Sequence, residues 1–256
     1  MTARPSPTLA GISVANVTLD EALARIAAWL EQPGFRRMAV VNAAILLEAE
    51  RDSDFRATLA AADLVTADGM SAVWATRWLP RLGGGLVARV TAPDVMEAVL
   101  ARCERLGYRV YLLGATTEAV AAASHRLRHR FPALAVAGAR DGYFAEADSV
   151  AVAEAIRAAR ADALFVAMGS PRQELWLARY GPRTGARFAL GVGGYFDILA
   201  GQRKRAPRWM QACGLEWCFR LMQEPRRLWR RYLIGNAAFV LFLAREWRRA
   251  GERMRA

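Results

Sequence analysis

Residues 163–174, ALFVAMGSPRQE, and residues 188–197, FALGVGGYFD, decide the fold that we expect for this chain. Each segment begins with a short apolar run of the length of a fully buried strand, and each then changes to glycine and polar residues. In an open α/β sheet, ligands bind outside the carboxyl ends of the strands, where such changes occur. The two segments therefore predict neighbouring loops over one pocket at one edge of the sheet.

Further strand and helix patterns alternate around these two segments. Thr18 with Glu21, and Asp94 with Glu97, have the spacing of capping boxes at the starts of two helices. Strands that alternate with helices of 10–15 residues favour an α/β fold, with a Rossmann-like, doubly wound and mostly parallel sheet. The additional strands are predicted at 8–17, 38–41, 63–66, 108–113 and 134–137, and the main helices at 19–30, 95–106, 115–130 and 149–160.

Residues 203–256 differ from the rest in charge and in pattern, and they predict a helical appendage. They hold 14 basic and four acidic side chains, a net charge of +10 out of +12 for the whole chain. Tryptophans are interleaved with arginines, and no strand pattern remains. Residues 232–244 are mostly apolar but too few to span a bilayer, so they suit a helix in the membrane interface. We therefore predict a catalytic domain at 1–202 and a membrane-associating appendage at 203–256.

Composition favours a cytoplasmic protein. No apolar run reaches the ~18 to 20 residues that span a bilayer, and residues 1–7 lack the pattern of a secretory signal. The three cysteines have no CxxC spacing, which favours reduced core thiols over disulfides or metal ligands. We expect peripheral attachment to the inner face of the cell membrane through the basic appendage. The sequence leaves a homo-oligomer open.

Three polar residues in the first part of the chain are candidates for chemistry. Asp68 follows a buried strand, where low-dielectric walls can tune its pKa for general base work; the alternative is an ordinary Asp-Gly turn. Asn42 ends the preceding strand and would face the same cleft, or it caps the next helix. Arg89 follows a Gly/Pro loop at 80–85, a candidate lid, and could clamp a diphosphate; the alternative is a solvated surface arginine.

Glycines after three of the expected strands would let the backbone approach a pyrophosphate. None of them belongs to a GxGxxG pattern. Ser170, Gln173 and Glu174 form a polar cluster, and Gln173 can donate to and accept from a nucleobase or a sugar hydroxyl. The alternatives are tight-turn packing for the glycines and a capped helix start for the polar cluster. The glycines are Gly114, Gly169, Gly191, Gly193 and Gly194.

Metal ligands are weakly indicated. His125 and His129 stand four residues apart on one expected helix, but no third ligand lies nearby in the sequence. Asp52 and Asp54 lie inside a helical, charged stretch rather than at the end of a strand. We therefore predict a reaction that uses neither a metal ion nor another cofactor.

In combination, these motifs resemble the WecG/TagA/CpsF family of bacterial glycosyltransferases. They occur in the family's order over roughly residues 10–235. No single piece is decisive, whereas the ordered set is highly specific. The matching pieces are 41–43, 62–69, 89–91, 169–174, 191–194, 205–207, 214–217, 220–221 and 224–227.

This resemblance implies a Rossmann-like enzyme that transfers a sugar, with inversion, from a UDP-sugar to a polyprenyl-diphosphate-linked saccharide. The sugar is typically N-acetylmannosamine or its uronic acid, and the products serve cell-envelope or exopolysaccharide synthesis. By position, Asp68 resembles the family's proposed general base, and Arg89 and Gln173 resemble active-site residues that contact donor or acceptor. The basic appendage positions thought to meet the diphosphates are matched by Arg220, Arg227 and Arg230.

The sequence departs from the family pattern at Val40, where many relatives carry a threonine two residues before the asparagine of the first motif. A methyl group cannot replace the hydrogen bonds of a hydroxyl, so recognition of a sugar or acceptor group there can differ. Some relatives in exopolysaccharide pathways use UDP-glucose and a lipid-linked glucose acceptor. The donor sugar therefore stays open between the two types.

Two other classes of function fit parts of the sequence. A basic segment with aromatic residues is also typical of a nucleic-acid-binding protein, but the apolar run at 232–244 argues against it. The α/β pattern fits a nucleotide-cofactor oxidoreductase, but the missing GxGxxG pattern argues against that. We expect a glycosyltransferase whose partners are a UDP-sugar, a polyprenyl-diphosphate-linked saccharide and an anionic membrane surface, and not nucleic acid.

Overall fold

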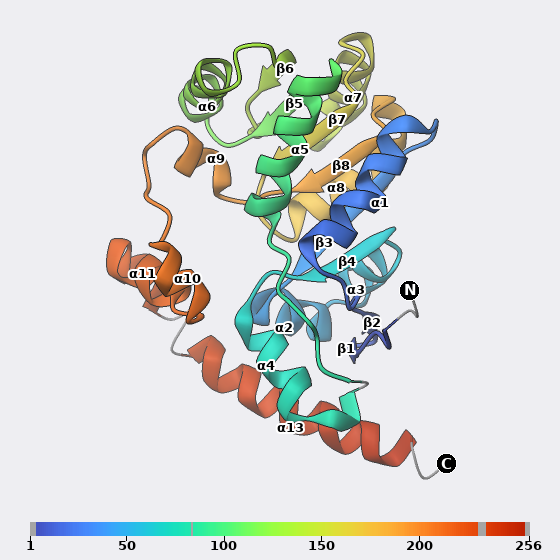
Figure 1. Cartoon of the computed structure of the whole chain (residues 1–256), viewed down its shortest axis with the longest axis vertical. Helices are drawn as coiled ribbons and strands as arrows, with labels where there is room; N and C mark the ends of the chain where they lie inside the picture. The colour runs from blue at the N-terminus through green and yellow to red at the C-terminus, as the bar shows by residue number, and fades with distance from the viewer. Residues whose placement is uncertain (1–3, 83, 230–233, 254–256) are drawn as a thin grey trace.

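The computed structural model describes residues 4–82, 84–229 and 234–253, and its centre is a six-stranded sheet (Figure 1). The strand order is β4-β3-β8-β7-β5-β6, and every neighbouring pair runs parallel. A separate antiparallel pair, β1 (Thr8–Leu9) and β2 (Ile12–Ser13), forms the entering arm. The strands of the main sheet are β3 (Arg36–Val41), β4 (Leu64–Ala67), β5 (Arg109–Gly114), β6 (Ala135–Arg140), β7 (Ala163–Ala167) and β8 (Phe188–Gly191).

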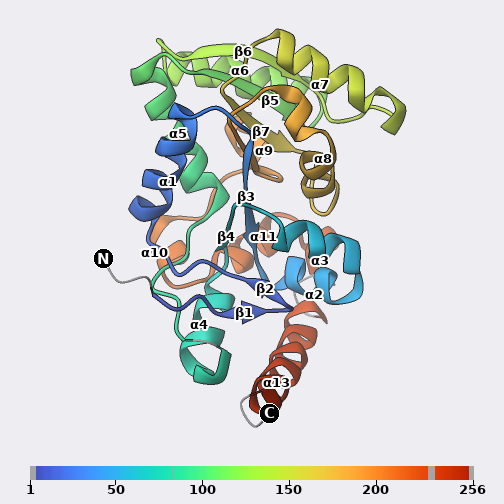
Figure 2. The ribbon, with the colours of Figure 1, turned by 90° about the vertical axis from the view of Figure 1, so that its right-hand side faces the viewer.

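Helices cover both faces of this sheet, which confirms the predicted α/β class. Figure 2 shows α1 and α5 on one side of the strands and α3 and α8 on the other. The first face carries α1 (Leu19–Glu31), α5 (Ala92–Leu106), α6 (Thr117–Arg130) and α9 (Tyr195–Leu199). The second face carries α2 (Ala43–Arg51), α3 (Ser53–Ala60), α7 (Ser149–Ala158) and α8 (Arg172–Tyr180). The remaining short elements of this part are α4 (Met70–Trp78), η1 (Pro80–Leu82), η2 (Glu146–Asp148) and η3 (Gly181–Thr184).

The chain changes its direction of travel across the sheet where β3 and β8 lie side by side. From β3 it runs outward to β4, crosses to β5 and β6, and returns through β7 to β8. The segment after β3 enters α2 on one face, whereas the segment after β8 enters α9, which packs on α6 on the other. Ligands in open α/β sheets bind in the crevice at such a switch point, outside the carboxyl ends of the strands.

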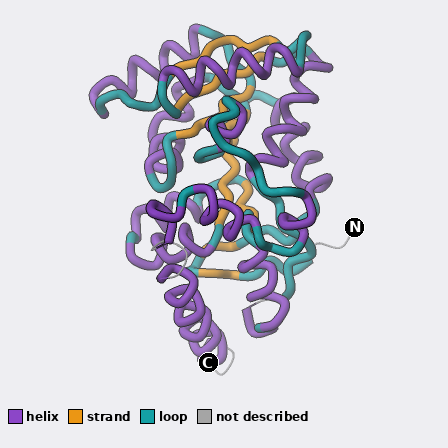
Figure 3. Tube along the Cα trace, turned by 90° about the vertical axis from the view of Figure 1, so that its left-hand side faces the viewer, coloured by secondary structure: helices purple, strands orange, loops and turns teal. Residues whose placement is uncertain are grey.

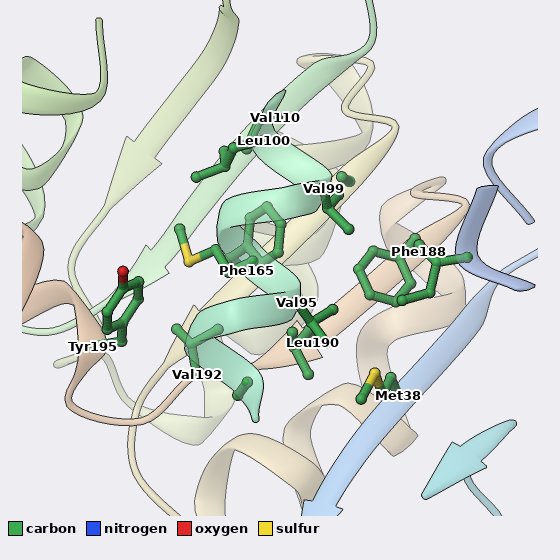
Figure 4. Packing of buried hydrophobic residues seen from close by; sticks show 14 of the residues in the cluster. Met38, Val95, Val99, Leu100, Val110, Phe165, Phe188, Leu190, Val192 and Tyr195 are labelled. Carbon is green, nitrogen blue, oxygen red and sulfur yellow. The ribbon is translucent and has the colours of Figure 1, made fainter. Parts of the chain in front are cut away.

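The largest core cluster packs α5 and α1 against the central strands (Figure 4). Val95 and Val99 of α5 lie over Phe165, Phe188 and Leu190, and all five side chains are buried. The rings of Phe165 and Phe188 meet edge to face, with centroids 6.3 Å apart. A sheet covered on both faces needs strands without a polar face, which explains the unbroken apolar runs in the sequence.

Side-chain caps decide where two of these helices begin. Thr18 and Glu21 form the predicted capping box at α1. The capping box predicted for Asp94 and Glu97 is wrong, because Thr91 caps α5 and accepts a hydrogen bond from the amide of Asp94 at 3.2 Å. Pro93 then stands in the first turn, where its missing N–H costs nothing, so the helix begins before Asp94.

Residues 80–85, which the sequence suggested as a lid, include η1, and the residues that follow them are tied to the body of the protein. The amide of Val87 donates to Oδ1 of Asn16 at 2.8 Å, and the amide of Leu86 donates to Oγ1 of Thr76 at 3.2 Å. The guanidinium of Arg77 donates to the carbonyls of Leu86 and Val87. These contacts hold the segment just after residues 80–85, and the lid itself stays a prediction.

The C-terminal segment is helical, as predicted, and its last helix packs against the α/β part. Phe239, Phe242 and Ala250 of that helix enter a second core cluster with residues of α2, β3 and β4. Glu246 is buried and accepts a hydrogen bond from the amide of Ala10 at 3.2 Å. The division at residue 202 stays a prediction. The helices of this segment are α10 (Arg208–Ala212), α11 (Glu216–Gln223), α12 (Pro225–Trp229) and α13 (Gly235–Arg253).

The apolar stretch predicted at 232–244 falls mostly within α13, while residues 232 and 233 lie outside the described residues. One side of α13 is buried against the protein, whereas Val240 and Leu241 are 65% and 64% exposed. None of the helices in the described ranges combines the length and apolar character needed to cross a membrane.

Candidate active site

A cavity of about 350 Å³ lies at the carboxyl ends of β3 and β4. Four parts of the chain line it: the start of α2, the start of α4, the segment that leads into α5, and the C-terminal segment from 205 to 240. Figure 3 faces the side of the molecule on which α10 and α11 lie in Figure 1, with the strands behind helices and loops. The charged lining residues are Asp68, Arg89, Arg205, Glu216 and Arg220.

Asp68 lies directly after β4, where backbone contacts hold the loop. Its N–H donates to the carbonyl of Val41 at the end of β3, at 2.9 Å. Its carboxylate is close enough to the start of α5 for the backbone amide of Ala92 to lower the pKa of the carboxyl. The position is therefore set by two strands and a helix, and Asp68 is more than the tip of an Asp-Gly turn.

Burial raises the pKa of the Asp68 carboxyl above its ordinary value, and the negative charge of Glu216 raises it further. Arg220, Arg89 and the amide of Ala92 act in the opposite direction without reversing the shift. A carboxylate of raised pKa that borders a cavity has the properties of a general base near neutral pH.

Arg89 also reaches the cavity and is not a solvated surface arginine. Its side chain is only 17% exposed, and Nη1 lies 3.3 Å from Oε2 of Glu216. Its Nη2 donates to Oε1 of Gln211, also at 3.3 Å. Both partners belong to the C-terminal segment, so contacts across the cavity hold Arg89 in place.

Two further arginines of the C-terminal segment line the same cavity. Nη2 of Arg220, a predicted diphosphate contact, lies 3.7 Å from Oε1 of Glu216, and its side chain is 47% exposed. Nη2 of Arg205 lies 2.7 Å from Oδ1 of Asp94. Burial lowers the pKa of Arg205, but the neighbouring carboxylates of Asp94 and Glu216 outweigh it and leave a net increase. Arg205 therefore remains a cation in this setting.

Asn42 has both of the roles that the sequence left open. Its Oδ1 accepts hydrogen bonds from the amides of Ala44 and Ile45, at 3.1 and 3.2 Å, and so caps α2. Asn42 also lines the cavity, because β3 ends beside β4. Capping therefore fixes the residue at the edge of the cavity.

Apolar side chains complete the cavity. Trp74 of α4, Trp217 of α11, and Phe239 and Val240 of α13 are among its lining residues. Trp74 also packs closely on Gly214, where an added Cβ would lie 2.6 Å from the ring. A cavity with guanidinium groups and large apolar side chains can receive a ligand that is anionic in one part and apolar in another.

The glycines predicted to hold a nucleotide end three other strands at the same edge of the sheet, and none of them is among the residues that line this cavity. Gly114 ends β5 with φ 130°, and a Cβ there would lie 2.5 Å from backbone atoms of Ala167 on β7. Gly169 has φ 78° and open space around it. Gly191 ends β8, and Gly193 and Gly194 lead into α9. Tight packing thus accounts for Gly114, whereas Gly169 leaves room beside the backbone.

Gln173 is buried, and both ends of its amide are used within the protein. Oε1 accepts from the amide of Gly193 at 3.1 Å, and Nε2 donates to Oε1 of Glu174 at 2.8 Å. Gln173 thereby joins the loop after β8 to the start of α8. Its contact with a donor or acceptor stays a prediction. Its hydrogen bond with the amide of Gly193 positions the glycine loop after β8.

Glu174 is 4% exposed, and its Oε2 makes no hydrogen bond within the described residues. Burial raises the pKa of its carboxyl, while hydrogen bonds from Gln173 and Ser170 lower it. Ser170 itself is exposed. The polar cluster is therefore partly a buried network beside the loop and partly an exposed rim. No side chain caps the start of α8, so the alternative of a capped helix start finds no support.

Several other predicted residues do not line the cavity or lie outside the residues that the structure describes. Arg230 lies outside the described residues, and only the backbone of Arg227, in α12, is described. Val40 is buried in the core cluster under the sheet's first face. His125 and His129 are exposed on α6. Across the described residues, no group of three or more His, Cys, Asp and Glu side chains is arranged to hold a metal ion.

Sequence reasoning assigned no role to Glu216 or Arg205, although both fall in pieces that match the family pattern. Glu216 is the first residue of α11, so its local pattern is that of an acidic residue at a helix start. Arg205 lies in a strongly basic stretch where no single arginine stands out. What marks these two residues is a contact in space: Glu216 meets Arg89, and Arg205 meets Asp94. In each pair the partner lies more than 100 residues earlier in the chain.

Comparison with known families agrees with this geometry. The sequence model of the WecG/TagA/CpsF glycosyltransferase family matches residues 7–253. The match includes the strands of the sheet, the loop that carries Asp68 and the C-terminal helices that close the cavity. The protein is thus an enzyme, and the chain belongs to the WecG/TagA/CpsF family of glycosyltransferases.

Proposed function

We propose that the enzyme transfers a hexose or an N-acetylhexosamine of the N-acetylmannosamine type from a UDP-sugar to a polyprenyl-diphosphate-linked saccharide, with inversion and without a metal ion. One observation supports this function above all. Asp68, with its raised pKa, borders a cavity that also contains the guanidinium groups of Arg89, Arg205 and Arg220. Attack of a hydroxyl on a nucleotide sugar requires a base, and it requires cations where the diphosphate leaves.

In the proposed reaction, the Asp68 carboxylate removes the proton from the acceptor hydroxyl. The acceptor oxygen forms a bond to the anomeric carbon while the bond from that carbon to the UDP oxygen breaks. Attack opposite the leaving group inverts the configuration. Negative charge develops on the leaving UDP, and guanidinium groups stabilise it through charge-assisted hydrogen bonds.

The donor's nucleotide is proposed to lie at the loops after β5, β7 and β8. These loops end strands at the same edge of the sheet as the cavity, beside the switch point between β3 and β8. Gly169 leaves open space beside its backbone, and Gln173 holds the amide of Gly193. Backbone amides in such loops bind phosphate oxygens. The arrangement would place the anomeric carbon toward Asp68.

The acceptor's diphosphate is proposed to contact Arg220, together with Arg227 and Arg230. A membrane surface is the proposed source of this substrate. Large apolar side chains stand exposed on the C-terminal helices and on α4, and aromatic side chains among arginines suit an anionic interface. The most exposed of these side chains are Trp78, Trp209, Met222, Val240 and Leu241.

The test is a panel of UDP-sugars incubated with synthetic polyprenyl-diphosphate-linked saccharides and scored for UDP release. We expect release with one N-acetylhexosamine or hexose donor, unchanged by EDTA, and an inverted product by NMR. The UDP-glucose arm decides whether the enzyme belongs with the exopolysaccharide glucosyltransferases. Release that needs a divalent cation, or a product of retained configuration, contradicts the proposed mechanism.

A second experiment addresses the membrane surface. We expect the protein to float with liposomes that contain anionic lipid and to stay behind with neutral liposomes, because each basic side chain near such a surface contributes about 1 kcal/mol. A gel shift with DNA and RNA runs in parallel. Binding to nucleic acid without flotation argues against the membrane and for the basic segment as a nucleic-acid site.

A further inference from the structure

Glu216 has a position that its place in the sequence does not explain. Its carboxylate lies among three guanidinium groups, 3.3 Å from Arg89, 3.7 Å from Arg220 and 3.9 Å from Arg205. Its side chain is 19% exposed, and Asp68 and Glu216 are the two carboxylates among the described residues that line the cavity. A carboxylate surrounded by several cations organises them at one place, because each pair is weakly screened when partly buried.

The ion pairs of Glu216 join two separate parts of the chain. Arg89 precedes α5, whereas Arg205 and Arg220 belong to the C-terminal segment. A second carboxylate, Asp94 of α5, holds Arg205 at 2.7 Å from the other side. The charges therefore alternate from Asp94 through Arg205 and Glu216 to Arg89. Removing Glu216 would leave Arg89 with the amide oxygen of Gln211 as its remaining side-chain partner within the described residues.

The same charges act on Asp68. Glu216 raises the pKa of the Asp68 carboxyl, second only to burial, while Arg220 and Arg89 lower it. Three of the charged groups that face Asp68 are thus the members of one ion-pair cluster. The backbone amide of Ala92 is the remaining group that acts on the carboxylate.

Building on the role proposed for Asp68, we propose that Glu216 is a positioning residue for sugar transfer. Its carboxylate gathers Arg89, Arg205 and Arg220 around the cavity and sets the electrostatic environment of Asp68 from the C-terminal segment. Glu216 takes no part in bond making or breaking. It acts through Arg89 and Arg205, which it orients toward the leaving diphosphate, and through Arg220 at the acceptor's diphosphate. Its own negative charge near the base acts as well.

Glu50 provides a matched comparison for this role. Its side chain is 20% exposed and lies 2.8 Å from Arg245 and 3.8 Å from Arg249, two arginines of α13. It therefore has the same residue type, the same exposure and the same kind of tie between the α/β part and the C-terminal segment. Glu50 is not among the residues that line the cavity. A role that is merely structural should be shared by both residues.

The test compares E216Q, E216D and E50Q with the parent enzyme, each checked by circular dichroism and thermal unfolding. We expect kcat of E216Q to fall on the order of tenfold or more, because misplaced arginines orient the leaving group poorly. The acid limb of its pH–rate profile should move to lower pH, since removing a negative charge lowers the pKa of Asp68. E216D should keep the parent's acid limb with an intermediate kcat, and E50Q should change neither.

A titration that needs no turnover separates this role from the proposed function. The carboxyl carbon of Asp68 is followed by NMR in protein labelled at aspartate, and its resonance is assigned by its absence from D68N. We expect the midpoint to be lower in E216Q than in the parent and in E50Q. If Asp68 titrates with the same midpoint in E216Q and in the parent, the proposal is overturned, whether or not the parent enzyme catalyses the proposed reaction. If E216Q does not fold, E216D with the parent's kcat overturns it instead.

Discussion

Two regions at one edge of the sheet are built in different ways. The cavity around Asp68 is assembled from side chains of four distant segments, and ion pairs hold these together across the space that a substrate would enter. The loops after β5, β7 and β8 are built from backbone turns close in sequence to the strands they follow. The loops are held by contacts with neighbouring strand ends and with one another, whereas the cavity also needs the C-terminal helices to be in place.

This difference separates two kinds of dependence on the fold. A glycine loop keeps its shape as long as its own strand, the neighbouring strand ends and the helices that follow them are formed. The cavity loses one wall if α13 leaves α2, because Phe239 contributes both to the lining and to the second core cluster. Substitutions in the C-terminal segment should therefore lower the rate of sugar transfer. Substitutions in the glycine loops should lower the free energy of unfolding and the affinity for the donor.

The strongest test of the cavity is Asp68→Asn. We expect kcat to fall by about 10²- to 10⁴-fold, the range that a positioned general base contributes, with donor affinity unchanged. UDP release and isothermal titration with UDP measure the two quantities. Unaltered turnover removes Asp68 from the role of base and leaves the cavity as a binding site only.

The thermal stability of Asp68→Asn provides a control, because the direction in which its Tm should change follows from the pKa of Asp68. Burial raises the pKa of Asp68, so the native state binds this proton more tightly than the unfolded state. The corresponding stability is present below the unfolded pKa and is lost as pH rises through the folded pKa. At pH 7 the neutral asparagine should therefore have a Tm no lower than the parent's. A clear loss of Tm at that pH means that the lost turnover reflects misfolding.

The second test breaks the wall that α13 forms. Phe242 is fully buried in the second core cluster and stacks near Phe239, with ring centroids 5.7 Å apart. Phe242→Ala should cost about 3–5 kcal/mol of unfolding free energy, as for other buried phenylalanines. It should also lower kcat/KM, because α13 lines the cavity. Leu241→Ala, at a position of α13 that is 64% exposed and is not among the lining residues, is the matched control and should change stability by less than about 0.5 kcal/mol.

The sequence predicted the sheet, its helices and the loop residues that follow the strands. Asp68, Asn42 and Gly114 were found because each comes directly after a buried run, and a local pattern marks that position. For Arg89 the place after a Gly/Pro loop left a surface arginine open, and the family resemblance suggested the active site; Arg89 lines the same cavity as Asp68. Strand ends are local features, so one sequence suffices to locate them.

The partners of these residues could not be predicted in the same way. Glu216 meets Arg89 across 127 residues of sequence, and no pattern in either segment specifies the other. The capping of α5 was misplaced by three residues, because Thr91 outcompeted Asp94 once Pro93 was accommodated in the first turn. The packing of α13 against the α/β part could not be predicted from the sequence either, since an apolar stripe suits a membrane surface and a protein core equally well.

The third test concerns the glycine loops. Gly114→Ala places a Cβ 2.5 Å from the backbone of Ala167 at φ 130°, and we expect a loss of about 2–4 kcal/mol in unfolding free energy. Gly169→Ala meets no neighbour within 4 Å and keeps only the strain of φ 78°, so it should cost about 1 kcal/mol. Urea unfolding of both variants measures the difference. Equal losses mean that β5 and β7 can separate to admit the methyl group.

The smallest expected effect distinguishes positioning of the glycine loop from direct contact with the donor. Gln173→Ala removes the acceptor for the amide of Gly193 and the donor to Glu174, whose carboxylate is already buried. We expect a loss of about 1–3 kcal/mol in unfolding free energy, from groups left without partners. Glu174→Gln in the same background should recover part of this loss, because it removes the buried charge. If Gln173 acts through Gly193, KM for the donor rises in Gln173→Ala and stays raised in the double variant, because Glu174→Gln supplies no acceptor for the amide of Gly193. In Gln173→Glu combined with Glu174→Gln, a carboxylate at 173 can again accept from Gly193 and receive the amide donor at 174. A donor KM that returns there supports positioning, and one that stays raised indicates that the Gln173 amide itself contacts the nucleotide or the sugar.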